Sequence, residues 1–422
     1  MAIKLSWYKD YRWTIIIIML IGSIMNYLDR VNLSMANTTI AGEFGFNSVQ
    51  MGWLLSAFAI SYMWTNLPMG WLVDKWGLGR IFLWSTLAWS VATVAGGFIQ
   101  GFMSMFLIRI LLGIAEAPFF ICAGKVTQLY FADKERGLAS SVVNMGPKIA
   151  NGFAPPLITY MMLFMGWRGM FIALGLFGIV IAVLWLIYYR GDNYKPPHAP
   201  IFKTASLVRN FSFNKLLWHP TTIWLNLGNI GTSYVFWLYF TWLPTYLTKD
   251  RGMSLTTAGW IAAIPFLAGV LAVPIGGWIS DKLIKRGMST IKARLVPTVG
   301  GSLLAAVAVI PVNYVSSTTI AVALITISLF AGALRVGVLW ALVGDISPRE
   351  AVGTIGGIQN SASFIGGALA PLGTGYIIAF TGSYDFVFVI SGILCAISAI
   401  CYAMIKRPIA ADEIIKSAST TA

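Results

Sequence analysis

Long apolar segments recur along the entire chain, and this repetition restricts the fold more than any other feature. Each run is about 20 residues or longer, the length that an α-helix needs to cross the roughly 30 Å hydrocarbon layer of a membrane. Twelve runs cover residues 13–36, 50–73, 81–101, 103–130, 137–161, 168–189, 220–247, 256–280, 291–313, 318–343, 352–379 and 383–406. Only 10% of the residues are charged, against about 25% in soluble proteins. The sequence therefore predicts an all-α membrane protein with twelve transmembrane helices.

Positive charge is distributed unevenly between the two ends of the predicted helices. Lys and Arg concentrate in the N-terminal segment, in the loops after even-numbered helices and in the C-terminal tail, whereas the opposite loops hold only Arg168, Lys249 and Arg251. Cytoplasmic loops carry such an excess, so we expect both termini in the cytoplasm. The net charge of +14 then reflects topology, and we expect no nucleic-acid partner.

The chain contains one six-helix pattern written twice. GWLVDKWG at 70–77 is repeated as GWISDKLI at 277–284, on either side of a polar connector at 190–219. We therefore expect an N-terminal six-helix bundle at 1–189, a cytoplasmic linker, and a C-terminal bundle with a short tail at 220–422. Halves of equal orientation predict a pseudo-two-fold axis along the membrane normal, with a substrate site near the midplane.

These motifs resemble a known family. GWLVDKWGLGR at 70–80 is similar to the signature between helices 2 and 3 of the major facilitator superfamily. NYLDRVN at 26–32 and RILLGIAEAPFF at 109–120 resemble its anion:cation symporter family, which includes bacterial D-galactonate, other sugar-acid and aromatic-acid proton symporters. FTWLPTYL at 240–247 and GGIQNSASFIGG at 356–367 resemble helices 7 and 11 of that family. The resemblance implies proton-coupled import of a carboxylate by alternating access.

Ionisable residues lie well inside the predicted helices, where each charge costs about 3 kcal/mol. The six are Asp29, Arg30, Arg109, Glu116, Lys148 and Arg335. We expect them to face one another and a water-filled cavity. Four cations against two acids favour an organic anion such as a sugar acid, a dicarboxylate or an aromatic acid. An anion uniporter or exchanger and a sodium-coupled symporter remain alternatives, and a drug/proton antiporter for cations fits a basic cavity less well.

The two acids are candidates for proton coupling. Arg109 and Glu116 are seven residues apart and share one helix face. They could belong to a structural ion pair that holds the first and fourth helices together, or Glu116 could carry a proton and respond to substrate arriving near an arginine. The family resemblance implies protonation at Asp29 and Glu116.

Cationic side chains are candidates for binding the substrate. Arg30 is our first choice, because a guanidinium binds a carboxylate through two parallel hydrogen bonds; alternatively it only neutralises Asp29. Arg109, Lys148 and Arg335 add positive charge. Lys148 could instead snorkel or pair with an acid, and Arg335 could belong to a cytoplasmic gate.

Neutral polar and aromatic residues complete the candidate substrate site. Asn144 and Asn360 occupy equivalent positions in the two halves, and their amides can bind hydroxyls or carboxylates. The resemblance implies roles for Tyr27, Tyr62 and Asn360, and Trp340 adds a further ring. Packing or anchoring at the membrane interface is the alternative for each ring.

A second group of charges is expected to lock the inner gate. Asp74, Arg80 and Asp281 lie at predicted cytoplasmic helix ends, and Lys125 is a candidate partner of Asp74.

Catalytic and metal-binding motifs are missing from the sequence. The two histidines, His198 and His219, lie in or beside the linker, and neither HExxH, GxSxG nor a phosphate loop occurs. Cys122, Cys395 and Cys401 have no ligand spacing. We therefore expect no enzyme, cofactor or metal, but a monomer in a bacterial inner membrane.

Overall fold

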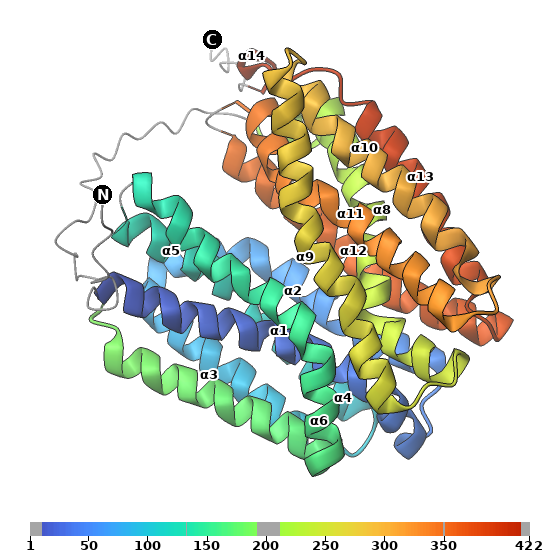
Figure 1. The fold of residues 1–422 in the computed structure, drawn as a ribbon. Helices are drawn as coiled ribbons and strands as arrows, with labels where there is room; N and C mark the ends of the chain where they lie inside the picture. Colours follow the sequence, from blue (N-terminus) through green and yellow to red (C-terminus); the bar gives the residue numbers. More distant parts are fainter. Residues whose placement is uncertain (1–10, 132, 192–211, 349–350, 415–422) are drawn as a thin grey trace, which may run out of the picture. The chain divides into compact units, whose positions relative to one another are not determined.

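A computed structural model describes residues 11–131, 133–191, 212–348 and 351–414 (Figure 1). Every regular element within them is a helix, as predicted. Nine stretches of the described residues are long and apolar enough to cross a membrane. One of them, Leu138–Tyr188, holds two successive helices. Two more helices, α2 (Ser48–Trp76) and α8 (Pro220–Thr245), also reach spanning length. This pattern agrees with the predicted twelve-helix fold.

The chain divides into two compact units. Unit 1 comprises residues 1–203 together with 240–263, and unit 2 comprises 204–239 together with 264–422. The C-terminal end of α8 and the start of α9 (Leu255–Lys285) therefore belong to unit 1. Most of the predicted linker, residues 192–211, lies outside the described part of the chain.

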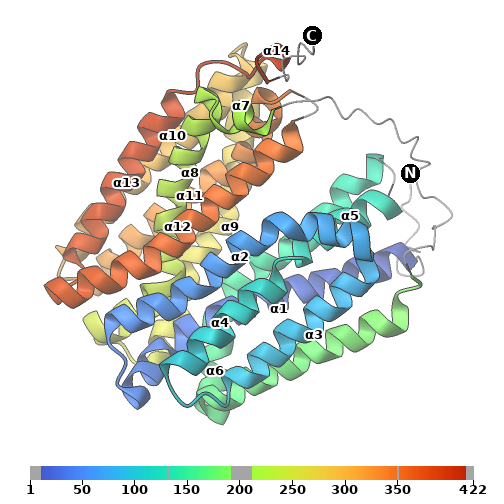
Figure 2. The same ribbon diagram turned by 180° about the vertical axis from the view of Figure 1, so that it is seen from behind.

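Unit 1 is built around α1 and α6. Besides α2, its helices are α1 (Tyr11–Phe44), α3 (Leu78–Gly96), α4 (Phe102–Glu116), α5 (Phe119–Tyr130) and α6 (Asp133–Tyr188). Helix α6 packs on α1 and α3, and α2 packs on α4. Figure 2 shows α3 and α6 side by side from behind, as Figure 1 does from the front.

Helix breaks in unit 1 follow from two residues. The predicted helix 103–130 divides into α4 and α5 at Pro118, which has no N–H to continue the backbone ladder. The predicted helices 137–161 and 168–189 meet at Gly166 inside α6, where φ is 70°. This left-handed conformation strains residues with a side chain, so glycine is favoured there.

Unit 2 is also built from helices. Its elements besides parts of α8 and α9 are α7 (Phe213–Leu217), α10 (Thr290–Val309), α11 (Thr318–Ile346), α12 (Val352–Thr381), α13 (Asp385–Ala403) and α14 (Ala411–Ile414). Helix α10 packs on α11 and α13, and α12 contacts α11 and α13. A π-turn, η2 (Tyr246–Asp250), follows α8 in unit 1, and a 3₁₀ turn, η3 (Ile310–Asn313), follows α10.

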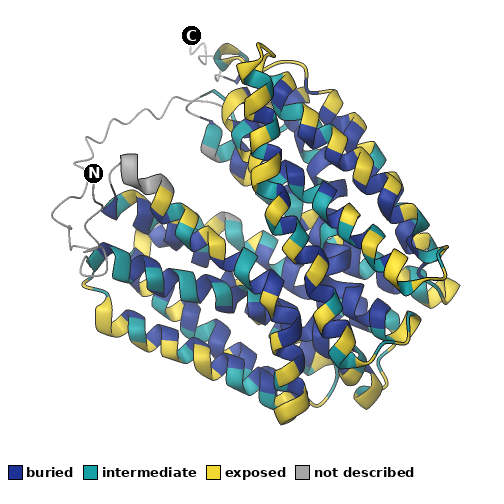
Figure 3. Ribbon diagram, viewed as in Figure 1, coloured by how far each residue is buried: buried dark blue, intermediate teal, exposed yellow. Residues whose placement is uncertain are grey.

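Exposed residues occur along the helices of both units (Figure 3), and many of them are large and apolar. Phe164 is 90% exposed and Phe380 is 84% exposed, whereas many charged and amide side chains are buried. Exposed apolar groups and buried charged groups are unfavourable in water but favourable in a lipid bilayer, because hydrocarbon solvates apolar groups and excludes charge.

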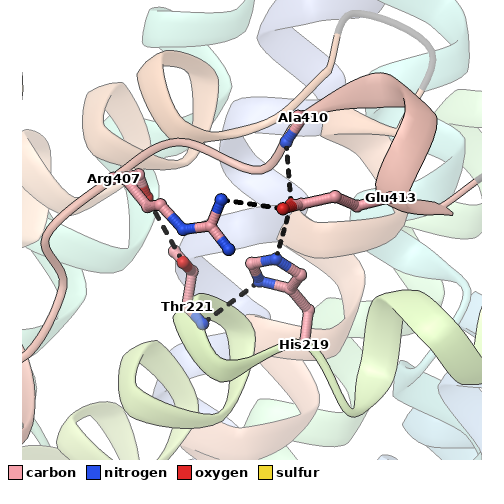
Figure 4. A network of polar contacts seen from close by, with 5 residues as sticks. All are labelled: His219, Thr221, Arg407, Ala410 and Glu413. Carbon is pink, nitrogen blue, oxygen red and sulfur yellow. Dashed lines mark hydrogen bonds and ion pairs between the residues drawn. The ribbon is translucent and has the colours of Figure 1, made fainter.

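A polar network attaches the C-terminal tail to the start of α8 (Figure 4). His219 Nδ1 accepts from the Thr221 N–H at 3.2 Å, so the neutral ring carries its hydrogen on Nε2, which lies 3.0 Å from Glu413 Oε2. The Ala410 N–H and Arg407 Nη1 also donate to Glu413. These hydrogen bonds, with His219 first, lower the pKa of the Glu413 carboxyl below its usual value. His219 thus has a structural role here.

Candidate functional site

Four of the predicted ionisable residues come together in the interior of unit 1. Helix α1 supplies Asp29 and Arg30, and α4 supplies Arg109 and Glu116. None of the four is more than 3% exposed. Asp29 and Arg30 lie more than about 20 Å from either end of α1, given the rise of an α-helix. The polar residues in the middle of α1 and those of α4 therefore form one buried cluster of two acids and two bases.

An ion pair between Arg30 and Glu116 joins α1 to α4. Arg30 Nε lies 3.0 Å from Glu116 Oε2, with both side chains buried. Arg30 Nη2 donates to Asn26 Oδ1, one helical turn earlier, at 2.7 Å. Glu116 is the last residue of α4, immediately before the break at Pro118, and among the described residues its Oε1 has no hydrogen-bond partner. Arg30 is thus oriented by an acid that retains one vacant acceptor.

Aromatic rings surround the same guanidinium. The Arg30 Cζ lies 4.6 Å from the ring centre of Tyr27 and 4.9 Å from those of Phe58 and Tyr62. A guanidinium is weakly hydrated and is attracted to ring faces, so it tolerates this environment better than an ammonium would. Of the rings implied by the sequence, Tyr27 and Tyr62 do lie beside Arg30.

Asp29 has a different environment from Glu116. Within the described part of the chain, neither carboxylate oxygen of Asp29 has a hydrogen-bond partner. Arg109 donates from Nη1 to the backbone oxygen of Asp29, at 3.4 Å, and its guanidinium lies over Phe58. Arg30 forms its ion pair with Glu116 and not with Asp29. The Glu116 carboxylate is thus held in an ion pair, whereas both carboxylate oxygens of Asp29 lack a described hydrogen-bond partner.

The other candidates in unit 1 lie in varied environments. Lys148 on α6 is half-buried. Asn144 is exposed, and its amide donates to Ser140 on the preceding turn at 2.8 Å. Arg80 is exposed, and the side chain of Asp74 lies outside the described atoms. Lys125 Nζ donates to the backbone oxygen of Val73 at 3.2 Å, so its pairing with Asp74 stays a prediction.

Arg335 is a buried cation of unit 2. It is 7% exposed, and its Nη1 donates to Asn229 Oδ1 on α8 at 2.9 Å. Asn360 on α12 is half-buried, whereas Trp340 on α11 is 56% exposed. The predicted ring at Trp340 thus lies largely outside the packed interior of its unit.

Asp281 belongs to a charged triad of unit 2. Arg294 Nη1 lies 2.7 Å from Asp281 Oδ1, and Arg294 Nε lies 3.2 Å from Asp345 Oδ2. The triad joins the ends of α9, α10 and α11. Arg294 and Asp345 were not predicted, because residues on different helices have no mutual spacing in the sequence.

Several contact residues were also not predicted from the sequence. Asn26 had a usable signal, since it lies four residues before Arg30 and therefore on the same helix face. Phe58 and Asn229 had none, because apolar rings and amides are common in such helices. No cluster of three or more His, Cys, Asp or Glu suited to a metal ion occurs in the described ranges. All three cysteines are buried.

Comparison with known proteins finds relatives that are named as transporters. A family model described as Major Facilitator Superfamily matches residues 19–371. The chain is 34% identical over 411 residues to the probable L-galactonate transporter of Escherichia coli strain K12, covering 95% of this chain and 91% of that protein. It is 32% identical over 438 residues to the probable galactarate/D-glucarate transporter GarP of the same strain, covering 96% and 97%.

A solved structure shares the fold at low sequence identity. It is the crystal structure of a bacterial homolog of the human lysosomal transporter Spinster, in an inward-facing and unoccupied conformation. The TM-score is 0.77 with 20% identity, and the match covers 94% of this chain and 95% of the other. Because the sequence identity is low, this likeness shows a shared helical fold and carries no conclusion about function.

Proposed function

Because the chain belongs to the Major Facilitator Superfamily, we propose that it is a secondary active transporter that imports an organic anion together with protons. Names of the relatives favour a sugar acid, since they include galactonate and galactarate/D-glucarate transporters. Alternating access of the two halves is the mode of transport expected for this family.

The observation that carries the proposal is the buried pair of Arg30 and Glu116. The Glu116 carboxylate and a substrate carboxylate are chemically equivalent acceptors for the same guanidinium. Protonation of Glu116 removes its negative charge and frees Arg30 to bind the substrate through both sides of its fork. Competition for one arginine therefore links the binding of an anion to the binding of a proton.

Asp29 provides the second proton site of the proposal. A buried carboxylate without hydrogen bonds is costly in its ionised form, and a proton removes that cost. Because Arg30 and Arg109 remain charged, the cluster in unit 1 is neutral when both acids are ionised and positive when either is protonated. Protonation thus prepares this cluster for an anion.

The remaining assignments complete the proposal. Substrate contacts extend to Tyr27, Tyr62, Arg109, Asn144, Lys148, Arg335, Trp340 and Asn360, and the inner gate uses Asp74, Arg80, Lys125 and Asp281. The uneven distribution of Lys and Arg supports cytoplasmic termini. The proposed protein is a monomer in a bacterial inner membrane. It acts as a carrier and not as an enzyme.

Uptake into proteoliposomes tests the proposal. With an imposed inward proton gradient, the wild-type protein should accumulate labelled L-galactonate or D-glucarate above the external concentration. Glu116→Gln should abolish accumulation but retain exchange of labelled for unlabelled acid, because the neutral amide imitates the protonated carboxyl.

A matched control is Glu43→Gln, which removes an acid near the end of the same α1 helix, where Glu43 pairs with Arg168. This variant should accumulate substrate as the wild type does. Uphill uptake that persists in Glu116→Gln would remove Glu116 from the coupling. Accumulation driven by a sodium gradient alone would replace the proton in the proposal.

A further inference from the structure

The buried guanidinium of Arg335 has only part of its hydrogen bonding satisfied. Nη1 donates to Asn229 Oδ1 at 2.9 Å, whereas Nε has no acceptor among the described residues. Arg335 lies about 16 Å from the Ile346 end of α11, by the rise of an α-helix, which is near the middle of a membrane. An arginine with a vacant donor at this depth needs an explanation.

No described acid of unit 2 neutralises Arg335. Asp281 and Asp345 pair with Arg294, and Glu413 pairs with His219 and Arg407. Asp385 accepts hydrogen bonds from Asn313 and Ser383, and Asp412 is exposed. Removing a charge from water costs several kcal/mol unless a counter-charge is present. The described acids of unit 2 do not supply this counter-charge, and a bound anion would supply it.

The neighbours of Arg335 hold it in place without neutralising it. Asn229 Nδ2 donates to the backbone oxygen of Gln359 on α12 at 2.7 Å, which directs the Asn229 oxygen toward Arg335. One turn along α8, Ser233 bonds Ser363 of α12 at 2.9 Å. The side-chain oxygen of Gln359 is buried and has no partner in the described structure. Neutral groups thus fix the guanidinium and leave its charge available.

The backbone next to Arg335 is also fixed. A Cβ placed on Gly276 of α9 would lie 1.9 Å from the carbonyl oxygen of Leu334, so α9 and α11 touch through their backbones at this point. A rigid position lets a planar guanidinium present its donors in one direction, which two-point recognition of a carboxylate requires.

We propose that Arg335 and Asn229 form a carboxylate-binding subsite in unit 2, and that the transported acid is a dicarboxylate. This inference rests on the proposed function. It differs from the role of Arg30, whose charge is already balanced by Glu116. Arg335 is positive without a bound acid group, so it contributes a permanent positive charge that a second carboxylate can neutralise.

Binding measurements on the purified full-length protein test the subsite, with D-glucarate as dicarboxylate and L-galactonate as monocarboxylate. Asn229→Asp places a carboxylate directly on Arg335 and should weaken D-glucarate binding by about 30-fold or more, as expected for a buried charge pair. Arg335→Gln should do the same by removing the charge. Arg335→Lys keeps the charge without the fork and should lose less. L-galactonate should be weakened several-fold less by each variant.

The control is Arg407→Gln, which removes an exposed guanidinium of the tail and should leave both affinities unchanged. Wild-type affinity for D-glucarate in both Asn229→Asp and Arg335→Gln would overturn the subsite. Equal losses for the two acids would overturn its assignment to a second carboxylate. A wild-type protein that binds neither acid would instead contradict the proposed function.

Discussion

Single side chains decide how charge is tolerated inside unit 1. Asp29 and Glu116 are both fully buried carboxylic acids near the same two arginines, yet only Glu116 forms an ion pair. A paired buried acid contributes to folding, whereas an unpaired one opposes it when ionised. The two positions should therefore respond in opposite ways to an amide of the same shape.

We predict that Glu116→Gln lowers the melting temperature of the detergent-purified protein and that Asp29→Asn raises it. The first change leaves Arg30 buried without its counter-charge, which costs about 3–5 kcal/mol. The second removes a carboxylate that has no described hydrogen bond. Intrinsic tryptophan fluorescence during heating measures both. Similar destabilisation by Asp29→Asn would instead make Asp29 a structural partner.

Helix contacts depend on glycines that the repeated motif does not identify. Gly277 begins the repeat GWISDK, and a Cβ there would meet no described heavy atom within 4 Å. The preceding residue, Gly276, makes the backbone contact between α9 and α11. Gly70, which corresponds to Gly277 in the first half, also has open space in the described structure. The first glycine of each motif copy, Gly70 or Gly277, is therefore not required for packing against the described residues in this conformation.

Adjacent alanine substitutions separate the two glycines. Gly276→Ala should destabilise the protein by about 1–3 kcal/mol, the usual cost of overpacking, because the methyl group would collide with a backbone oxygen. Gly277→Ala should be neutral or slightly stabilising, since alanine favours a helix over glycine. Thermal unfolding of the two variants under one condition provides the comparison. Equal stability of the variants would contradict the α9–α11 contact.

At the scale of the molecule, the sequence predicts the positions of most helices, whereas the contacts between helices appear only in the structure. Apolar runs indicate the positions of the helices, because a segment that crosses lipid must be apolar over its whole length. For example, α8 ends within a few residues of its predicted end. The break at Pro118 inside a predicted helix was missed, although proline is the residue that causes it. Periodicity also grouped Arg109 with Glu116 on one face of α4.

Partners on different helices could not be predicted in the same way. Spacing relates residues within one helix, and the repeat relates equivalent positions, but neither relates Arg30 to Glu116 or Arg335 to Asn229. Those pairs depend on the packing of helices that are distant in sequence. For the same reason, the triad at Arg294 appeared only in the structure.

At the scale of the molecule, the charges buried deep inside the described helices support the proposed import of protons. Arg12 is also buried but lies at the start of α1. Away from the ends of the described helices, two acids balance Arg30 and Arg109 in unit 1, and Arg335 adds one positive charge in unit 2. A doubly charged acid would leave one negative charge in excess, and protonation of Asp29 or Glu116 removes it. Entry of the acid should therefore bring at least one proton.

Luminal pH in proteoliposomes tests this requirement most directly. A trapped pH-sensitive dye reports the lumen while D-glucarate is added outside, with no sodium present and protein-free vesicles as the control. We predict that the lumen acidifies as labelled acid enters through the wild-type protein, and that Glu116→Gln produces no acidification. Entry of labelled acid through the wild type with no change in luminal pH would contradict proton-coupled import.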